Sequence, residues 1–180
     1  MSMIPQSILE NKPRILRRLT FFAIILAVAM IQNIGLLPEI VGLRFMPLLP
    51  LVLSISLFEK ETYGLNFGLL AGILMDVNVG RADGTNALFF ALMGFVCGLL
   101  MTYLMMNNLI TASLLAAVFE LLYAGYSCLL HCGFSADAVW ALFGFYLPSA
   151  LMNLLTLPLI YYFVRAVNKP FRVMGNEDFY

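Results

Sequence analysis

Two carboxylates lie inside long apolar stretches of the sequence, where an acid is costly unless something compensates it. Glu120 lies near the middle of one stretch and Asp76 near the end of another. An intramembrane acid requires a proton, a partner or a water-filled cavity. For Glu120 two interpretations stay open. In the first, it is a proton or cation site, or an anchor for a polar residue of a partner. In the second, it is a protonated acid hydrogen-bonded to Tyr123 or Asn153.

Further polar residues lie close to these acids or within the same apolar runs. Arg81 and Asn86 follow Asp76 closely, which favours a structural knot of polar groups at a helix end, with a salt bridge to Arg81 as one form of it. Asn66 and Asn153 are expected to hydrogen-bond between helices, each contributing about 0.6 kcal/mol. We therefore expect Asp76, Asn86, Glu120 and Asn153 to be buried polar residues.

The sequence motifs typical of catalysis are missing. There is one histidine, and the metalloprotease, serine hydrolase and phosphate-loop motifs do not occur. Cys128 and Cys132 share a helix face, but His131 projects about 100° away from Cys132. They and Cys97 are expected to be packing residues. We expect no enzyme activity, no catalytic residue, no metal site and no cofactor.

The composition indicates a membrane protein. Hydrophobic residues make up 62% and charged residues 11% of the 180 positions, whereas a soluble domain carries about 25% charged residues. The length allows a single domain over 1–180, and a net charge of zero gives no field favouring nucleic acid. The apolar segments predict an all-α bundle of six transmembrane helices, at about 19–37, 45–58, 63–79, 86–106, 109–130 and 138–164, with tails 1–18 and 165–180.

The placement of basic residues predicts the orientation. If both termini are cytoplasmic, eight of the ten lysines and arginines lie inside: Lys12, Arg14, Arg17, Arg18, Lys60, Arg165, Lys169 and Arg172. Only Arg44 and Arg81 lie outside, as the positive-inside rule favours. Glu59 and Glu61 are expected in a solvated turn. The short segment 45–58 is expected to be tilted or partly re-entrant, and Trp140, Tyr161 and Tyr162 are expected at the membrane interface.

Glycines recur every four residues in the third segment. The stripe consists of Gly64, Gly68, Gly72, Asp76 and Gly80, and the fourth segment repeats the spacing at Gly94 and Gly98. Small residues at this spacing let helix backbones approach closely. The stripe therefore predicts a packing face, and the repeated spacing makes the third and fourth segments candidate neighbours. The partner helix belongs either to this chain or to another.

These motifs resemble those of the bacterial rod shape-determining protein MreD family. The resemblance lies in Gly68-Leu-Leu-Ala-Gly72-Ile-Leu-Met-Asp76, Gly84-Thr85-Asn86-Ala87 and Gly94, with Pro47 and Pro50 before them and Asn153-Leu-Leu-Thr-Leu-Pro158 after. It implies a non-enzymatic scaffold of the cell-elongation and peptidoglycan-synthesis machinery in the bacterial inner membrane. The implied partners are the bitopic protein MreC, RodA with its penicillin-binding transpeptidase, indirectly MreB, and membrane lipid. A homodimer stays open.

A second resemblance gives an alternative function. MreD-like proteins are similar in fold to the six-helix S components of energy-coupling-factor vitamin transporters. Ala23 and Ala27 match the small-residue pair with which those proteins dock on their transmembrane partner. The short outer loops, poor in polar and aromatic clusters, speak against a vitamin site. A membrane enzyme is the third and least favoured alternative.

Overall fold

Helices make up all the regular structure of the described part of the chain. The computed structural model describes residues 6–34, 45–79, 83–103, 108–133 and 137–175. Its elements are α1 (Gln6–Asn33), α2 (Leu48–Ser56), α3 (Glu61–Val79), α4 (Thr85–Tyr103), α5 (Leu109–Cys132), α6 (Asp137–Ala141), the π-helical turn η1 (Leu142–Tyr146) and α7 (Leu147–Gly175). The all-helical class expected from the composition is confirmed.

Four of the described helices are long and apolar enough to cross a membrane. They cover Arg14–Gln32, Thr85–Tyr103, Leu109–Cys132 and Val139–Pro170. Each has at least 19 residues, within the range of about 17–25 that spans a hydrocarbon core about 30 Å thick. Together with the composition, they make the chain a helical membrane protein.

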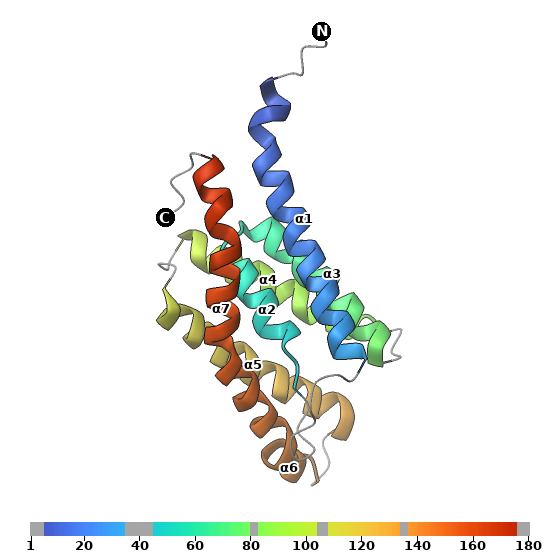
Figure 1. Cartoon of the computed structure of the whole chain (residues 1–180). Helices are drawn as coiled ribbons and strands as arrows, with labels where there is room; N and C mark the ends of the chain where they lie inside the picture. The colour runs from blue at the N-terminus through green and yellow to red at the C-terminus, as the bar shows by residue number, and fades with distance from the viewer. Residues whose placement is uncertain (1–5, 35–44, 80–82, 104–107, 134–136, 176–180) are drawn as a thin grey trace.

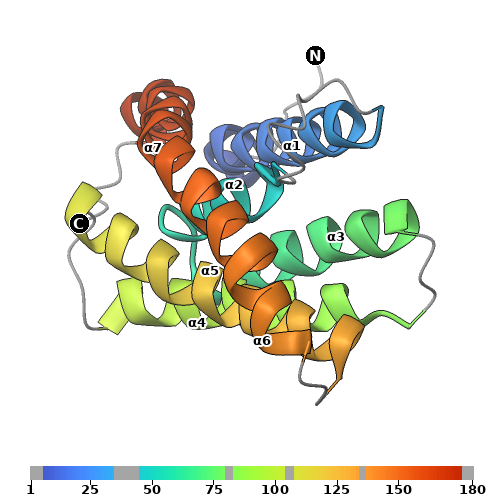
Figure 2. The same ribbon diagram turned by 90° about the horizontal axis from the view of Figure 1, so that it is seen from below.

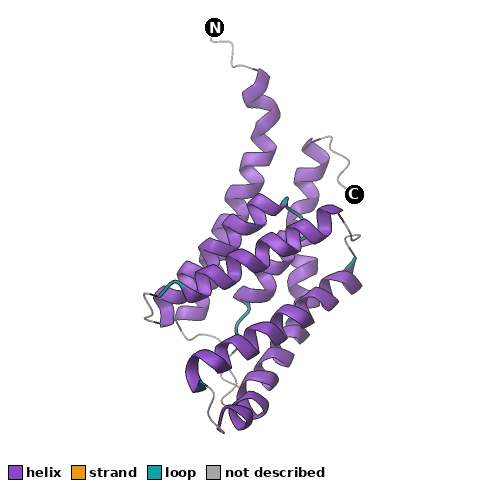
Figure 3. Ribbon diagram, turned by 180° about the vertical axis from the view of Figure 1, so that it is seen from behind, coloured by secondary structure: helices purple, strands orange, loops and turns teal. Residues whose placement is uncertain are grey.

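The helices surround the short helix α2. Viewed from below, α1, α3, α4, α5 and α7 lie around α2 (Figure 2), and each of these five helices contacts it. The most extensive contact between any two described elements joins α3 and α4. The start of α1 and the end of α7 lie toward the same end of the molecule (Figure 1), and α1 extends beyond its neighbours there (Figure 3).

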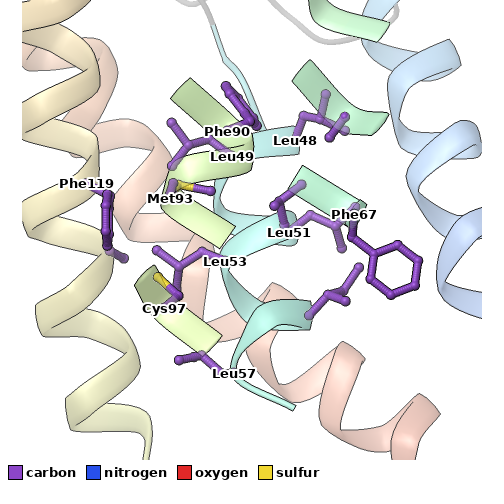
Figure 4. Packing of buried hydrophobic residues seen from close by; sticks show 14 of the residues in the cluster. Leu48, Leu49, Leu51, Leu53, Leu57, Phe67, Phe90, Met93, Cys97 and Phe119 are labelled. Atoms are coloured by element: carbon purple, nitrogen blue, oxygen red, sulfur yellow. The ribbon is translucent and has the colours of Figure 1, made fainter. Parts of the chain in front are cut away.

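Helix α2 is too short to cross a bilayer by itself. Its nine residues are all buried, and at 1.5 Å per residue they cover only about 14 Å. Leucines of α2 pack among Phe67 of α3, Met93 of α4 and Phe119 of α5 (Figure 4). Two α2 serine hydroxyls donate to carbonyls one turn earlier, at 2.8 and 2.9 Å, so no polar group of theirs is left unpaired in the interior.

The first and last helices are longer than the apolar segments that predicted them. Helix α1 begins at Gln6 and α7 continues to Gly175, so most of the expected tails 1–18 and 165–180 is helical. The apolar pattern marks only the part of a helix that lies in hydrocarbon. Lysine, arginine and glutamate are good helix formers and extend it into water.

A π-helical turn interrupts the last long helix. The N–H of Leu147 donates to the carbonyl of Leu142, five residues earlier. Pro148 follows directly. It has no N–H for the carbonyl four residues back, and its ring would clash with that carbonyl in a regular α-turn. The wider turn accommodates the proline and places Phe145 and Tyr146 beside α5, which η1 contacts.

Candidate functional site

The glycine stripe of α3 lies against α4 of the same chain. A Cβ added at Gly64 would collide with the backbone of Gly94, and one at Gly68 with the carbonyl oxygen of Phe90. At Gly72 it would lie 2.6 Å from the carbonyl oxygen of Asn86. These obstacles are backbone atoms, which cannot rotate away. The glycine stripe of α3 therefore packs against α4 of the same chain.

The same contact continues toward the start of α3. A Cβ at Gly98 of α4 would lie 2.7 Å from the Cα of Glu61. The predicted positions Gly64, Gly68, Gly72, Gly94 and Gly98 thus form one antiparallel seam between α3 and α4. Gly80, the last member of the predicted stripe, lies outside the described residues.

Asp76 caps the start of α4. Its Oδ1 accepts the N–H of Asn86 at 3.2 Å, and its Oδ2 accepts the N–H of Ala87 at 2.9 Å. The first N–H groups of a helix have no intrahelical partner, and a negative charge there interacts favourably with the helix dipole. Asp76 is therefore a capping residue supplied by the preceding helix. Arg81, its expected salt-bridge partner, lies outside the described residues.

Glu120 and Asn153 meet between α5 and α7. The amide of Asn153 donates to Oε2 of Glu120 at 3.3 Å, and its Oδ1 accepts the N–H of Met46 at 2.9 Å. Nearby, the hydroxyl of Tyr123 donates to Oδ1 of Asn86 at 3.3 Å. Of the two residues weighed as partners of Glu120, the structure brings it to Asn153. Through Asn153 the acid is also linked to the segment that precedes α2.

These polar residues lie around a cavity of about 260 Å³. Its walls come from the end of α3, the start of α4, the second half of α5 and the first part of α7 with η1. They include Met46, Met75, Asn86, Glu120, Tyr123, Ala124, Ser127, Leu130, His131, Phe145, Tyr146, Ser149, Ala150 and Asn153. Three of the four predicted buried polar residues thus line one cavity. The fourth, Asp76, accepts a hydrogen bond from the backbone N–H of Asn86, which lines the cavity.

A second polar cluster, not expected from the sequence, lies near the start of α3. Glu59 is only 6% exposed and pairs with Arg17 of α1, with Nε and Oε1 2.8 Å apart. The guanidinium of Arg18 lies over the Tyr63 ring, 3.6 Å from its centroid. The expectation of a solvated turn is therefore wrong for Glu59, because α1 extends far enough to cover it. Burial raises the pKa of Glu59, against the opposing charges of Arg17 and Arg18.

The packing decides the expectations for Asn66 and Tyr161, whereas the membrane-interface position of Tyr162 and Trp140 stays a prediction. Asn66 is exposed on the outer side of α3 and has no hydrogen bond to another described helix. Tyr161 is 1% exposed and packs on Phe58, so it is a core residue, whereas Tyr162 is 54% exposed. Trp140 is 81% exposed. In a membrane helix the face that packs in the core and the face that points outward are similar in composition. Only the tertiary contacts show which residues lie on which face.

The fold and the cavity define a helical membrane protein built around a buried central helix, with polar residues gathered where its helices end. Within that class, the family model for the rod shape-determining protein MreD matches residues 13–170. The chain belongs to the MreD family. Comparisons with curated proteins and with solved structures give no match.

Proposed function

We propose that this protein is a non-enzymatic scaffold of the bacterial cell-elongation machinery, held in the inner membrane together with MreC. The match to the rod shape-determining family over residues 13–170 carries the proposal. RodA, its penicillin-binding transpeptidase and, indirectly, MreB complete the assembly. The chain crosses the membrane six times, the second time through the whole segment 45–58 and not through α2 alone, and both termini are cytoplasmic.

The arrangement of charge supports this orientation. Arg17 contacts Glu59, between α2 and α3, and Arg18 contacts Tyr63 in the first turn of α3, so both lie close to Lys60. Arg165 and Lys169 lie near the end of α7, which is on the same side of the molecule as the start of α1 (Figure 1). Basic residues from three parts of the chain therefore gather at one end, as the positive-inside rule requires of a cytoplasmic face. Arg44 and Arg81 lie outside the described residues.

The partner's helix is expected on α1. The glycine seam is occupied by α3 and α4, so it offers no free face for MreC. On α1, Ala23 and Ala27 are both exposed, and the large side chains of Leu19 and Met30 stand exposed on either side of them. Small residues four apart allow close approach of a single membrane helix. We assign this alanine face to the single transmembrane helix of MreC.

Co-purification with MreC tests the assignment. The changes Ala23→Leu and Ala27→Leu fill the alanine face without entering the core, so each is expected to reduce the MreC recovered while leaving thermal stability unchanged. The control Ala166→Leu enlarges an exposed alanine on α7 and is expected to keep MreC binding. Ala29→Leu, at a position 3% exposed, is expected to destabilise the fold itself. Full MreC recovery with both α1 variants contradicts the assignment.

The alternative of a transporter S component is favoured by two observations. The alanine pair is exposed as a docking face requires, and the polar cavity offers space for a ligand. The same purification separates the two functions. An ATPase module recovered in place of MreC supports the transporter, and recovery of MreC alone supports the scaffold.

A further inference from the structure

The cavity described above has one acid with unused hydrogen-bonding capacity. Glu120 is 2% exposed and lines the cavity, and within the described part of the chain its Oε1 has no hydrogen-bond partner. The hydroxyl of Ser149, also in the wall, is likewise unpaired among the described residues. Both oxygens of Asp76 are occupied by backbone N–H groups. Glu120 is therefore the acid in this region that can accept a further donor.

A buried acceptor of this kind is costly. Removing a carboxylate from water without a full set of partners is unfavourable, and inside a membrane such groups mark ion or ligand sites. Asn153 satisfies one oxygen of Glu120, but its own carbonyl oxygen is held by the N–H of Met46. In this network Oε1 of Glu120 stays without a donor among the described residues. A donor from outside the chain is the simplest way to complete it.

The walls around Glu120 indicate what kind of donor fits. Aromatic rings of Tyr123, Phe145 and Tyr146 border the space, and His131 packs near Tyr146 with ring centroids 6.3 Å apart. Aromatic faces attract organic cations. Phe145 and Tyr146 reach the cavity from the π-helical turn η1, and such turns are frequent at functional sites.

The size and donor set argue against a single metal ion and against an anion. A volume of about 260 Å³ far exceeds a single ion and lies just under the range of about 300–1,000 Å³ for small-molecule sites. Calcium requires 6–8 oxygen ligands and magnesium near-octahedral oxygens, whereas this cavity offers one spare carboxylate oxygen. An anionic group would be repelled by Glu120. A small organic cation satisfies the charge, the aromatic walls and the volume together.

We propose that this cavity binds the ammonium group of a small amine, with Glu120 Oε1 as its acceptor and the aromatic side chains around it. The amine is supplied by an aminophospholipid headgroup or by a free primary amine. The cavity lies about 22 Å along α3 from Glu61, the distance covered by fifteen residues of helix. It is therefore at the end of the bundle opposite the Arg17–Glu59 pair. The site does not depend on the scaffold function proposed above.

The native chain tests the charge requirement without any substitution. Thermal unfolding of the full-length protein in a neutral detergent is followed with ethanolamine and with 1-propanol, which has a methyl group in place of the ammonium. Ethanolamine is expected to raise the midpoint in a saturable way, and 1-propanol is not. In parallel, vesicles with phosphatidylethanolamine are compared with vesicles of phosphatidylglycerol alone. Stabilisation by the lipid only identifies a headgroup as the source, and stabilisation by ethanolamine identifies a free amine.

Variants then assign the effect to the cavity. Glu120→Gln keeps the shape and removes the charge, and it is expected to weaken the response to the amine about tenfold or more. Ser149→Ala is expected to weaken it less. The control Glu61→Gln, at the other end of the bundle, is expected to respond as the native chain does. If Glu120→Gln fails to fold, the comparison of ethanolamine with 1-propanol on the native chain still tests whether the cavity binds an amine.

Two results would overturn the proposal. One is an equal response of the native chain to ethanolamine and 1-propanol together with an equal response to the two lipids. The other is a folded Glu120→Gln variant that responds as strongly as the native chain. Loss of MreC binding with the amine response intact would affect the scaffold proposal alone.

Discussion

The seam between α3 and α4 allows a prediction in which one substitution measures backbone contact directly. Gly68 and Gly125 both lie inside long helices, but their surroundings differ. A Cβ at Gly68 would collide with the carbonyl oxygen of Phe90, whereas one at Gly125 of α5 would meet no heavy atom within 4 Å. We compare Gly68→Ala with Gly125→Ala, because both add the same methyl group to a helix interior.

The magnitude follows from two opposing effects. Replacing glycine with alanine inside a helix is favourable by about 1 kcal/mol. Overpacking a closely fitted contact costs about 1–3 kcal/mol, and the cost at Gly68 lies toward the upper end because the obstacle is backbone. Gly125→Ala should therefore stabilise the protein by up to about 1 kcal/mol. The difference between the variants, in which helix propensity cancels, should be about 1–3 kcal/mol.

The assay is reversible unfolding in mixed micelles of a mild detergent and dodecyl sulfate, followed by circular dichroism. The free energy of unfolding is measured for the native chain and for each variant under the same conditions. Gly68→Leu serves as the larger perturbation and should prevent assembly of α3 against α4. Equal effects of Gly68→Ala and Gly125→Ala would refute the close approach of these helices at the seam.

Two further predictions concern the buried acids at the two ends of the bundle. Asp76→Ala leaves the N–H groups of Asn86 and Ala87 without an acceptor and should lower the free energy of unfolding by about 1–3 kcal/mol in the same assay. Asp76→Asn keeps one acceptor and should lower it less. Equal losses for the two variants would contradict the capping role of Asp76. Burial raises the pKa of Glu59 in the folded protein, so the folded state holds this proton more tightly than the unfolded state, and the stability contributed by protonation is lost as pH rises. The stability of the native chain relative to Glu59→Gln should therefore fall as pH rises above about 4.3; a relative stability that rises with pH would show that pairing with Arg17 outweighs burial.

Much of the architecture was predictable from local patterns. The four-residue spacing of Gly64, Gly68 and Gly72 predicted tight helix packing, and the same spacing at Gly94 and Gly98 pointed to α4 as a neighbour. Periodicity shows which residues share a helix face, but it does not identify the helix that packs against that face. Whether the stripe packs on a helix of this chain or on a helix of MreC is decided only by the tertiary structure, because both helices present the same kind of apolar surface to a glycine.

The candidate site was only partly predictable. An acid in an apolar run predicts a buried polar group, because placing it in an apolar environment is energetically unfavourable. This argument alone identifies Asp76 and Glu120. Their partners are 10 and 33 residues away in the chain. Glu59 was missed because a charged triplet in a short turn is usually solvated, and its burial depends on how far α1 extends.

By itself the sequence determined that the chain is a helical membrane protein, that glycines line one helix and that Asp76 and Glu120 need compensation. These follow from composition and periodicity, which are local properties and survive in any arrangement of the helices. Only the tertiary structure decided that α2 is buried at the centre, that Asp76 caps a neighbouring helix and that Glu120 faces a cavity with one oxygen unpaired. Those outcomes depend on distances between segments far apart in the chain, and local pattern does not contain them.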